Sequence, residues 1–422
     1  MPSNTHFLSS QTCYPPSEAI QDRSPVLSLQ SLPFAKSNLM KVGILSIFLL
    51  IAISAFSQGT PDILWQKSTP GTPFNGIAVS PDGRLVATAG TNAPVQVWNA
   101  TNGSLAHSLS GPTSWIGQLA FSPNGGYLAA GSGDRTVTLW ETTNWTLVSG
   151  FVTHQQGPAI AFSPDSSMIA LSSQANVELR SLPKFGLIRS WTAGTNEIPA
   201  VAFSPDGTRL ASSADFRGQD TRLKMWDVAT GNLLWAVPTA QTYSIGSLAF
   251  SPDGTRIATA NSLLNFSSSV QLFRVTDGAL LRTYPENANS VAFSPDGLTT
   301  LSAGTNLVLR SVQSGALIAS FTDGISANES RAITFAPDGS AFYYGHSSQH
   351  LFAARVPIAF HPFLLQPNGW TLRWNGGVGP YQPQFKTNLT DPWQDLGTPS
   401  TNQSFTISNQ YPNAFFRVIA PQ

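Results

Sequence analysis

The segment Phe203-Ser204-Pro205-Asp206-Gly207 decides the fold, because variants of it recur along the chain. Proline presets φ for a type I turn, Asp suits the next position, and glycine tolerates the left-handed position that follows. Apolar residues flank the motif on both sides, so we interpret it as the tip of a β-hairpin. The seven copies have a period of about 43 residues, which is typical of repeat architectures. Their prolines are Pro81, Pro123, Pro164, Pro205, Pro252, Pro295 and Pro337.

Each repeat contains more than one hairpin. The most complete unit runs from Val201 to Ser213 and, after a longer connection, from Leu223 to Trp235. Apolar runs separated by turn signals predict four short strands per unit. The third run ends in tryptophan in three units (Trp98, Trp140 and Trp226) and in another residue in three others (Arg180, Phe273 and Arg310).

This pattern resembles the WD-repeat family, whose units form the four-stranded blades of a β-propeller. The resemblance covers about Asp62 to Pro357. The family has a buried polar tetrad, and the resemblance assigns three of its roles in two units, to Ser132, Asp134 and Trp140 and to Ser213, Asp220 and Trp226. The Gly-His pair of the family is replaced by Gly111-Pro112 and Gly194-Thr195.

The two ends of the repeat region are expected to meet. The seventh unit stops after its third strand, and the segment Ile63-Leu64-Trp65-Gln66 is similar to the fourth strand at Leu233-Leu234-Trp235-Ala236. We therefore expect residues 62–67 to complete the last blade, which removes the exposed edges of an open array. The prediction is an all-β chain with a seven-bladed propeller over residues 58–357.

The pattern changes after residue 357. Short apolar runs such as Trp370–Trp374 and Phe415–Ile419 alternate with turn residues. Residues 358–422 are predicted to form a small β-sandwich similar to the fibronectin type III class, with Trp374 and Tyr381 in its core. This domain is interpreted either as an accessory module that packs on the propeller or as a binding module.

The N-terminal region carries a targeting signal. Residues 1–39 lack periodicity and are predicted to be a disordered or untranslated extension, with translation starting at Met40. Lys41, the apolar run 42–56 and the small residues Ala55 and Ser57 are typical of a signal peptide over residues 40–57. Cleavage is expected after Ser57, which predicts a secreted or periplasmic protein. The alternative is a protein anchored in the membrane by residues 42–56.

The composition and motifs give little indication of catalysis, metal binding or nucleic-acid binding. Formal net charge is zero, with 22 basic and 22 acidic residues, so no electrostatic footprint for nucleic acid is visible. The single cysteine, Cys13, precedes the predicted mature chain. Motifs for a nucleophilic serine, a phosphate loop or a zinc helix do not occur. His346 and His350 flank a turn, and the repeated aspartates are interpreted as turn formers. We therefore predict no catalytic residue, cofactor or metal.

A binding site is expected on the face opposite the Pro-Asp-Gly turns. Two connections between the second and third strands are enlarged, at residues 215–222 and 263–269. Enlarged loops on one face of a repeat array often form the binding face, although they are also tolerated insertions. The candidate partner-binding residues are Phe74, Trp115, Asn196, Glu197, Asp215, Phe216, Arg217, Tyr243 and Phe266.

Two functions remain open at this stage. The first is a non-enzymatic, monomeric scaffold that binds a protein partner, with no nucleic acid and no membrane contact beyond the signal peptide. The second is a carbohydrate-active hydrolase or lyase, or a glycan-binding protein, with its site at the central channel or the loop face. A convergent pair of carboxylates or a metal cluster at the channel mouth would favour the enzyme.

Overall fold

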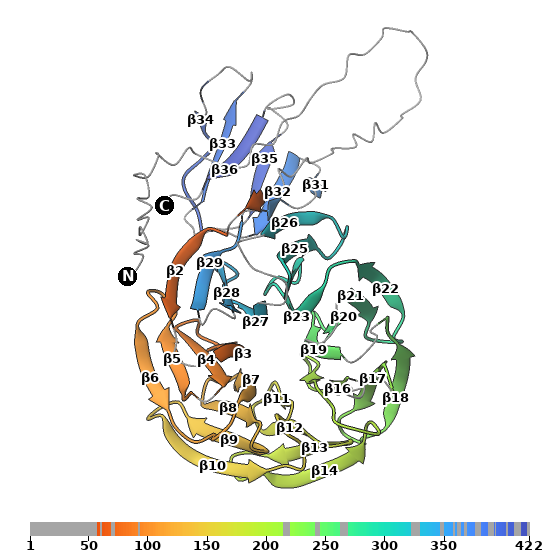
Figure 1. Cartoon of the computed structure of the whole chain (residues 1–422). Coiled ribbons are helices and arrows are strands. Elements are labelled where there is room, and N and C mark those ends of the chain that lie inside the picture. Colours follow the sequence, from red (N-terminus) through yellow and green to blue (C-terminus); the bar gives the residue numbers. More distant parts are fainter. Residues whose placement is uncertain are drawn as a thin grey trace, which may run out of the picture.

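The computed structural model shows an all-β molecule whose blades are arranged in a ring (Figure 1). It describes residues 57–59, 61–68, 72–91, 93–213, 220–240, 245–261, 269–321, 330–346, 350–357, 359–360, 364–366, 369–375, 381–386, 392, 394–401, 404–408 and 415–419. Every regular element assigned in these residues is a β-strand.

Seven antiparallel sheets of four strands form the blades, and each blade is written from strand a at the centre to strand d at the rim. Blades 1 to 3 contain β3 (Thr72–Val79), β4 (Leu85–Thr91), β5 (Val95–Asn99) and β6 (Leu105–Leu109); β7 (Ile116–Phe121), β8 (Tyr127–Ser132), β9 (Thr136–Glu141) and β10 (Thr146–Val152); and β11 (Ile160–Phe162), β12 (Met168–Ser173), β13 (Asn176–Ser181) and β14 (Gly186–Thr192).

Blades 4 to 6 follow in the same order around the ring. They contain β15 (Val201–Phe203), β16 (Arg209–Ser212), β17 (Arg222–Asp227) and β18 (Leu233–Pro238); β19 (Ile245–Phe250), β20 (Arg256–Asn261), β21 (Val270–Arg274) and β22 (Leu280–Tyr284); and β23 (Ala288–Phe293), β24 (Thr299–Gly304), β25 (Leu307–Ser311) and β26 (Leu317–Phe321).

Blade 7 is built from both parts of the chain. Strands β27 (Ser330–Phe335), β28 (Ala341–His346) and β29 (His350–Arg355) come from the end of the repeats, and β2 (Ile63–Ser68) is the outer strand. Strand β2 pairs antiparallel with β29, with Lys67 opposite Leu351. A further short strand, β1 (Ser57–Gly59), pairs in parallel with β26 at the rim of blade 6. The sequence pattern did not predict β1.

The C-terminal strands form two further sheets outside the ring (Figure 1). One contains β30 (Ala359–Phe360), β31 (Leu364–Gln366), β32 (Gly369–Asn375) and β35 (Ser404–Ser408), and the other contains β33 (Gln382–Lys386), β34 (Gln394–Asp395) and β36 (Phe415–Ile419). Tyr381 and Val418 are buried there. The likeness of this region to fibronectin type III stays a prediction.

The hydrophobic core lies between successive blades. Strands b and c are apolar on both faces because a blade packs against a neighbour on each side, so Val86, Leu128 and Leu301 are fully buried. One cluster joins blades 1 and 2 through Val97 and Ile116, and others join the remaining neighbours around the ring. Full burial of such a side chain stabilises a fold by roughly 1.5–3 kcal/mol.

The seven hairpin turns also lie next to one another around the ring. Their last residue has a φ between +61° and +73°, which is a glycine in six turns and Ser166 in the seventh. A methyl group built on each of the six glycines would lie 3.4–3.9 Å from the Cδ atom of the proline in the preceding blade. Gly83 of blade 1 lies in this way against Pro337 of blade 7, so the chain of contacts closes into a ring.

The rim has a second set of contacts between blades. A large side chain of strand d lies against the left-handed residue in the next blade's c–d turn. Where the side chain is Trp65, Trp191, Trp235 or Arg282, that residue is a glycine, namely Gly103, Gly231, Gly278 or Gly315. Where it is the smaller His107 or Phe151, the turn residue is Trp145 or Phe185, and the rings stack with centroids 4.6 and 5.9 Å apart. The two sides of each junction are therefore matched in size.

Candidate functional site

The b–c and d–a connections lie on one face of the ring, which we call the loop face. The backbone N–H of Gly133, in a b–c turn, donates to the carbonyl oxygen of Trp115, in a d–a loop, over 2.7 Å. The N–H of His154 donates to Ser173 Oγ over 3.2 Å and joins the same two kinds of connection in the next blades. The Pro-Asp-Gly turns lie at the other end of the same strands, so they occupy the opposite face.

Trp115 is fixed on the loop face by three glycines. A Cβ atom built on Gly133 would lie 2.3 Å from the indole Nε1, and one on Gly157 would lie 2.1 Å from Cη2. The corresponding distance from Gly117 to Cζ3 is 2.9 Å. A side chain at any of these positions would force the indole or the backbone to shift, because real Cβ atoms essentially never approach this closely. The ring therefore packs against bare backbone and remains half-buried.

Two glutamines connect the loops beside Trp115. Gln118 accepts from the N–H of Ile160 over 2.9 Å and donates to the carbonyl of Pro199 over 3.3 Å. Gln155, which is 2% exposed, donates to the carbonyl of Ile198 over 3.0 Å and accepts from its N–H over 3.3 Å. The d–a loops before blades 2, 3 and 4 form one sector of the loop face, because Gln155 joins the last two and Trp115, in the first, packs against Gly157 in the second.

Asp134 organises the b–c turn next to Trp115. Its carboxylate accepts from the N–H groups and hydroxyls of both Thr113 and Thr136. Burial alone would raise the pKa of Asp134, but these hydrogen bonds outweigh it and lower the pKa to about 2. Asp134 is therefore ionised at neutral pH.

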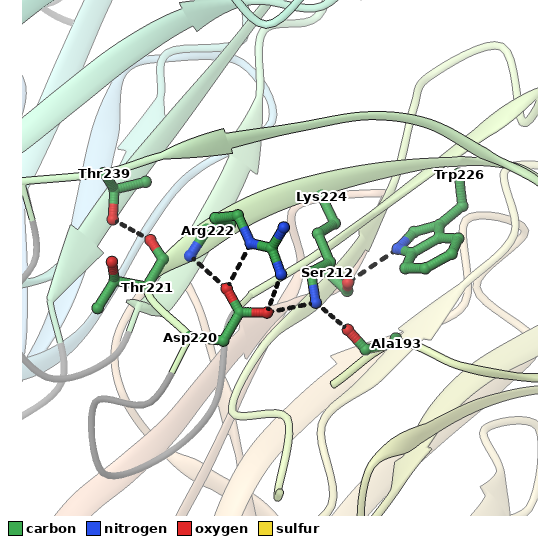
Figure 2. Close-up of polar contacts among 8 residues, drawn as sticks. All are labelled: Ala193, Ser212, Asp220, Thr221, Arg222, Lys224, Trp226 and Thr239. Atoms are coloured by element: carbon green, nitrogen blue, oxygen red, sulfur yellow. Dashed lines mark hydrogen bonds and ion pairs between the residues drawn. The ribbon is translucent and has the colours of Figure 1, made fainter. Parts of the chain in front are cut away.

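Asp220 is the centre of a second network on this face, in blade 4 (Figure 2). It accepts from Arg222 Nε over 2.8 Å and pairs with Lys224 Nζ over 2.6 Å. Lys224 Nζ also donates to the carbonyl of Ala193 over 2.6 Å. Burial raises the pKa of Asp220, but the donors from Arg222 and Lys224 outweigh it and hold that pKa far below its ordinary value. This network supports the start of β17.

Arg180 and Arg310 occupy the position in strand c that holds tryptophan in other blades, and both make the same three kinds of contact. Arg180 pairs with Glu178 over 2.6 Å, stacks 3.7 Å above the ring of Phe151 and donates to the carbonyl of Phe185. Arg310 does the same with Glu286 over 2.8 Å, with the ring of Tyr284 at 5.2 Å and with the carbonyl of Gly315. Each arginine thus joins its blade to an aromatic ring of the preceding blade, which is a structural role that the sequence pattern missed.

The predicted tetrads are not formed as expected. Trp226 Nε1 donates to Ser212 Oγ over 2.9 Å, whereas Ser213 Oγ accepts from the N–H of Ala200. In blade 2 the position equivalent to Ser212 is Ala130, which has no hydroxyl. Trp140 Nε1 therefore donates to the carbonyl of Ser110 over 3.3 Å. Asp134 accepts from Thr113 of the d–a loop and Thr136 of β9, and Asp220 pairs with Arg222 and Lys224 of β17. The sequence pattern assigned the hydroxyl role to Ser213 instead of its neighbour Ser212. Successive residues of a strand point to opposite faces, so only one of the two can reach Trp226.

The structure places three of the nine candidate residues in full. Trp115, Asn196 and Glu197 all belong to the sector joined by Gln118 and Gln155. Phe74 lies in β3, but its side chain is outside the described residues, as are Asp215, Phe216, Arg217, Tyr243 and Phe266.

Two histidines lie at the hairpin between strands b and c of blade 7. His346 and His350 are backbone partners in the β28–β29 hairpin, and His350 Nε2 lies 3.2 Å from Ser68 Oγ. Within the ranges that the structure describes, no group of three or more His, Cys, Asp or Glu side chains is arranged to hold a metal ion. In those same ranges, no helix is long and apolar enough to cross a membrane.

Comparison with known families agrees with the blade geometry. The family model for "WD domain, G-beta repeat" matches residues 103–141 and 185–227. Each matched segment begins in the c–d turn of one blade and ends with strand c of the next, at β9 and at β17. No curated protein matches the chain.

Proposed function

From the WD40 propeller that the matched repeats and the seven blades form, we propose that this protein is an interaction scaffold that binds a protein partner through its loop face. The proposal describes a non-enzymatic and monomeric protein. Residues 40–57 act as a signal peptide that leads to a secreted or periplasmic location, and residues 358–422 form a fibronectin type III-like module.

One observation carries the proposal, namely the difference between the two faces of the ring. The face that carries the Pro-Asp-Gly turns is nearly uniform. Six of its seven turns have the sequence Ser or Ala, then Pro, then Asp or Asn, then Gly, and the glycines have nearly the same φ. On the loop face, the connections differ in length and composition from blade to blade, and two of them are joined by the side chain of Gln155. Repetition serves assembly of the ring, whereas variation on a rigid frame serves recognition.

The experiment is a cross-linking capture with the full-length chain produced in its own host. The chain carries an affinity tag at its C-terminus, and captured proteins are identified by mass spectrometry. We expect a partner whose cross-links map to loop-face connections such as 110–116 and 193–200.

Matched variants separate recognition from folding. Glu197→Gln alters the loop face, whereas Asp277→Asn alters an exposed carboxylate of a c–d turn at the opposite end of the strands. A partner that is lost equally in both variants, or that cross-links to the Pro-Asp-Gly turns, would contradict the proposal. Peptides from residues 1–39 in the native protein would contradict the assigned start and the cleavage after Ser57.

A further inference from the structure

We propose that the outer edge of β10, at the rim of blade 2, pairs with a short, extended and uncharged segment of a protein partner. Strand β10 lies on the outside of the ring (Figure 1), so this site is distinct from the loop face. Within the described strands, only β9 pairs with β10, and the other edge of β10 carries no strand.

The first argument is that this fold already binds a strand at its rim. Strand β1 lies parallel to β26 and adds a fifth strand to the sheet of blade 6. It has the uncharged sequence Ser-Gln-Gly, and its three residues pair with the last three of β26, namely Ala319, Ser320 and Phe321. An outer edge of this propeller therefore binds a short extended segment through its unpaired backbone groups.

The second argument is the similarity of β10 to β26. The two strands contain Leu147-Val148-Ser149-Gly150-Phe151 and Leu317-Ile318-Ala319-Ser320-Phe321. Each segment consists of a leucine, a β-branched residue, two small residues and a phenylalanine. In the other five outer strands the third of these positions is large, with Trp65, His107, Arg189, Trp235 and Arg282. Among the outer strands, β10 thus comes nearest in sequence to the strand that binds β1.

The third argument is that β10 lacks the residues that protect an edge. Natural edge strands are commonly protected by charged residues or proline, which prevent unwanted strand pairing. Strands β2, β14 and β22 contain Lys67, Arg189 and Arg282, and β18 ends in Pro238. Strand β10 has seven residues and contains no charged residue, histidine or proline.

The edge of β10 also exposes an apolar surface with open space. Leu147, Val148 and Val152 are 57%, 40% and 70% exposed, whereas β26 has no exposed residue. Gly150 lies between the two valines and does not have a positive φ, so its backbone conformation does not require glycine. A Cβ built on Gly150 would lie 3.9 Å from the carbonyl oxygen of Val137, an ordinary contact. A glycine inside a strand often marks the close approach of another backbone.

The charges next to β10 favour an uncharged occupant. Arg180 lies over the ring of Phe151 from blade 3, but its guanidinium is paired with Glu178 over 2.6 Å. Lys184 is exposed in the c–d turn of blade 3, to which Ser149 Oγ donates over 3.2 Å. A basic segment would be repelled by this lysine, and an acidic one would place its charge against the apolar side chains of the strand.

A single segment fits this edge better than the sheet edge of a second copy. The pairing of β10 with β9 shifts between Leu147 and Ser149, which is a β-bulge at Val148. Bulges bend a strand and increase its twist, so they hinder the pairing of two long edges. A segment as short as β1 needs only the residues that follow the bulge.

The test measures hydrogen exchange of the full-length chain by mass spectrometry. The probe is a peptide with blocked ends and the sequence of residues 54–60, which includes β1 and has no charge. Its control is the same peptide methylated on the backbone nitrogens of its three middle residues, so that neither edge can form a ladder. With the probe at ten times its dissociation constant, the amides of β10 that point away from β9 should exchange about tenfold more slowly. The amides of β22, an edge that carries Arg282, should not change.

Variants test whether the edge itself binds the probe. Gly150→Lys introduces a protecting charge without a steric clash and should weaken binding about fivefold. Gly150→Ala should bind like the wild type, because it adds a side chain without a charge. Ser190→Lys is the matched control, since Ser190 is exposed at the equivalent position of β14, and it should also bind normally. Circular dichroism melts show whether each variant is folded.

The possible outcomes are distinct. The inference is overturned if exchange of β10 is not slowed, if the methylated peptide slows it equally, or if Gly150→Lys binds normally. It is also overturned if only β26 responds, because the probe would then merely replace β1. A wild-type dimer in sedimentation velocity that Gly150→Lys dissociates would make a second copy the occupant instead of a partner. None of these results depends on the loop face, so this inference and the proposed function can fail separately.

Discussion

Ser166 Oγ accepts a hydrogen bond from the backbone N–H of Asn124 in the preceding blade, over 3.0 Å. At the equivalent position the other six turns have a glycine, and a Cβ built on it would lie 3.4–3.9 Å from the proline Cδ of the preceding blade. Ser166 therefore adds a hydrogen bond between neighbouring turns, at a φ of +61° that side chains rarely adopt.

Ser166→Ala should destabilise the protein by about 1 kcal/mol, because it removes the hydrogen bond and retains the left-handed backbone. Ser166→Gly should stay within about 0.5 kcal/mol of the wild type, because the relief of backbone strain offsets the lost bond. Urea unfolding measures both, and the exposed neighbour Ser167→Ala is the control. Equal losses for alanine and glycine would show that the φ is not strained.

The size matching at the rim predicts that a second substitution restores the stability lost in the first. His107→Trp should destabilise the junction between blades 1 and 2 by about 2 kcal/mol, because Trp145 occupies the space into which the larger ring would extend. Adding Trp145→Gly recreates the Trp–Gly pair of Trp65 and Gly103. A double-mutant cycle on thermal unfolding should give a coupling of about 1–2 kcal/mol in favour of the double variant. Additive losses would contradict size matching.

Ring closure depends on Trp65. Its Nε1 donates to the carbonyl of Ala100 over 2.8 Å, and its ring packs on Tyr343 with centroids 5.9 Å apart. Trp235 makes the corresponding bond to Val275 over 3.0 Å, but its strand is joined to β17 by a hairpin. Both alanine variants should lose about 2–3 kcal/mol.

Hydrogen exchange distinguishes the two variants. Strand β2 comes from the other end of the repeat region, so no hairpin joins it to β29 and only non-covalent contacts hold the two strands together. Trp65→Ala should therefore expose the amides of β29 to exchange by local opening. Trp235→Ala should leave the amides of β17 protected. If β29 kept its protection in Trp65→Ala, the closing strand would not depend on this side chain.

The pair of Arg310 and Glu286 predicts a salt-insensitive contribution. Both side chains are less than 20% exposed, whereas in the pair of Arg274 and Asp277 both are about half exposed. Glu286→Gln should cost about 2 kcal/mol at low and high salt, since it leaves a shielded guanidinium without its counter-charge. Asp277→Asn should cost much less than Glu286→Gln, and less still at high salt, because water and salt screen an exposed pair. Chemical unfolding at two ionic strengths compares them.

The aspartates of the hairpin turns predict acid sensitivity. The hydroxyl of Ser204 donates to Asp206 Oδ1 over 2.5 Å and lowers the pKa of that carboxyl, and Ser163 does the same for Asp165. A carboxyl with a lowered folded-state pKa contributes stability above its unfolded value of 3.8, and this stability is lost as pH falls through the folded value.

Stability should therefore fall steeply below about pH 4. Asp206→Asn should flatten the slope of unfolding free energy against pH in this range, because one titrating group is removed. Melting temperatures at pH 2.5, 3, 4 and 6 measure the slope. An unchanged slope would mean that the turn carboxylates do not drive acid unfolding.

The propeller could be predicted from sequence because its signals are local. Seven turn motifs at a fixed period determine seven hairpins, and the likeness of Ile63–Gln66 to Leu233–Ala236 points to the strand that lies against β29. By contrast, β1 has no pattern of its own, and its pairing with β26 depends on which edge lies nearby in the folded ring.

The candidate site was harder to predict because its geometry comes from distant residues. Trp115 was a candidate as an aromatic side chain in a loop, but the glycines that hold it are ordinary turn residues in the sequence. Arg180 and Arg310 look like degenerate copies of the repeat, yet each finds an acidic partner and an aromatic ring only after folding. The short spacing of Glu178 and Arg180 on one strand face was the one local signal for such a pair.

The N-terminal segment holds the rims of two blades at once, with β1 on blade 6 and β2 in blade 7. A pulling force applied at the N-terminus would therefore act first on the seam of the ring. Strand β1 would be detached before β2, and only the release of β2 would open the circle of blades. The short added strand thus acts as a mechanical buffer that shields the closing strand from tension.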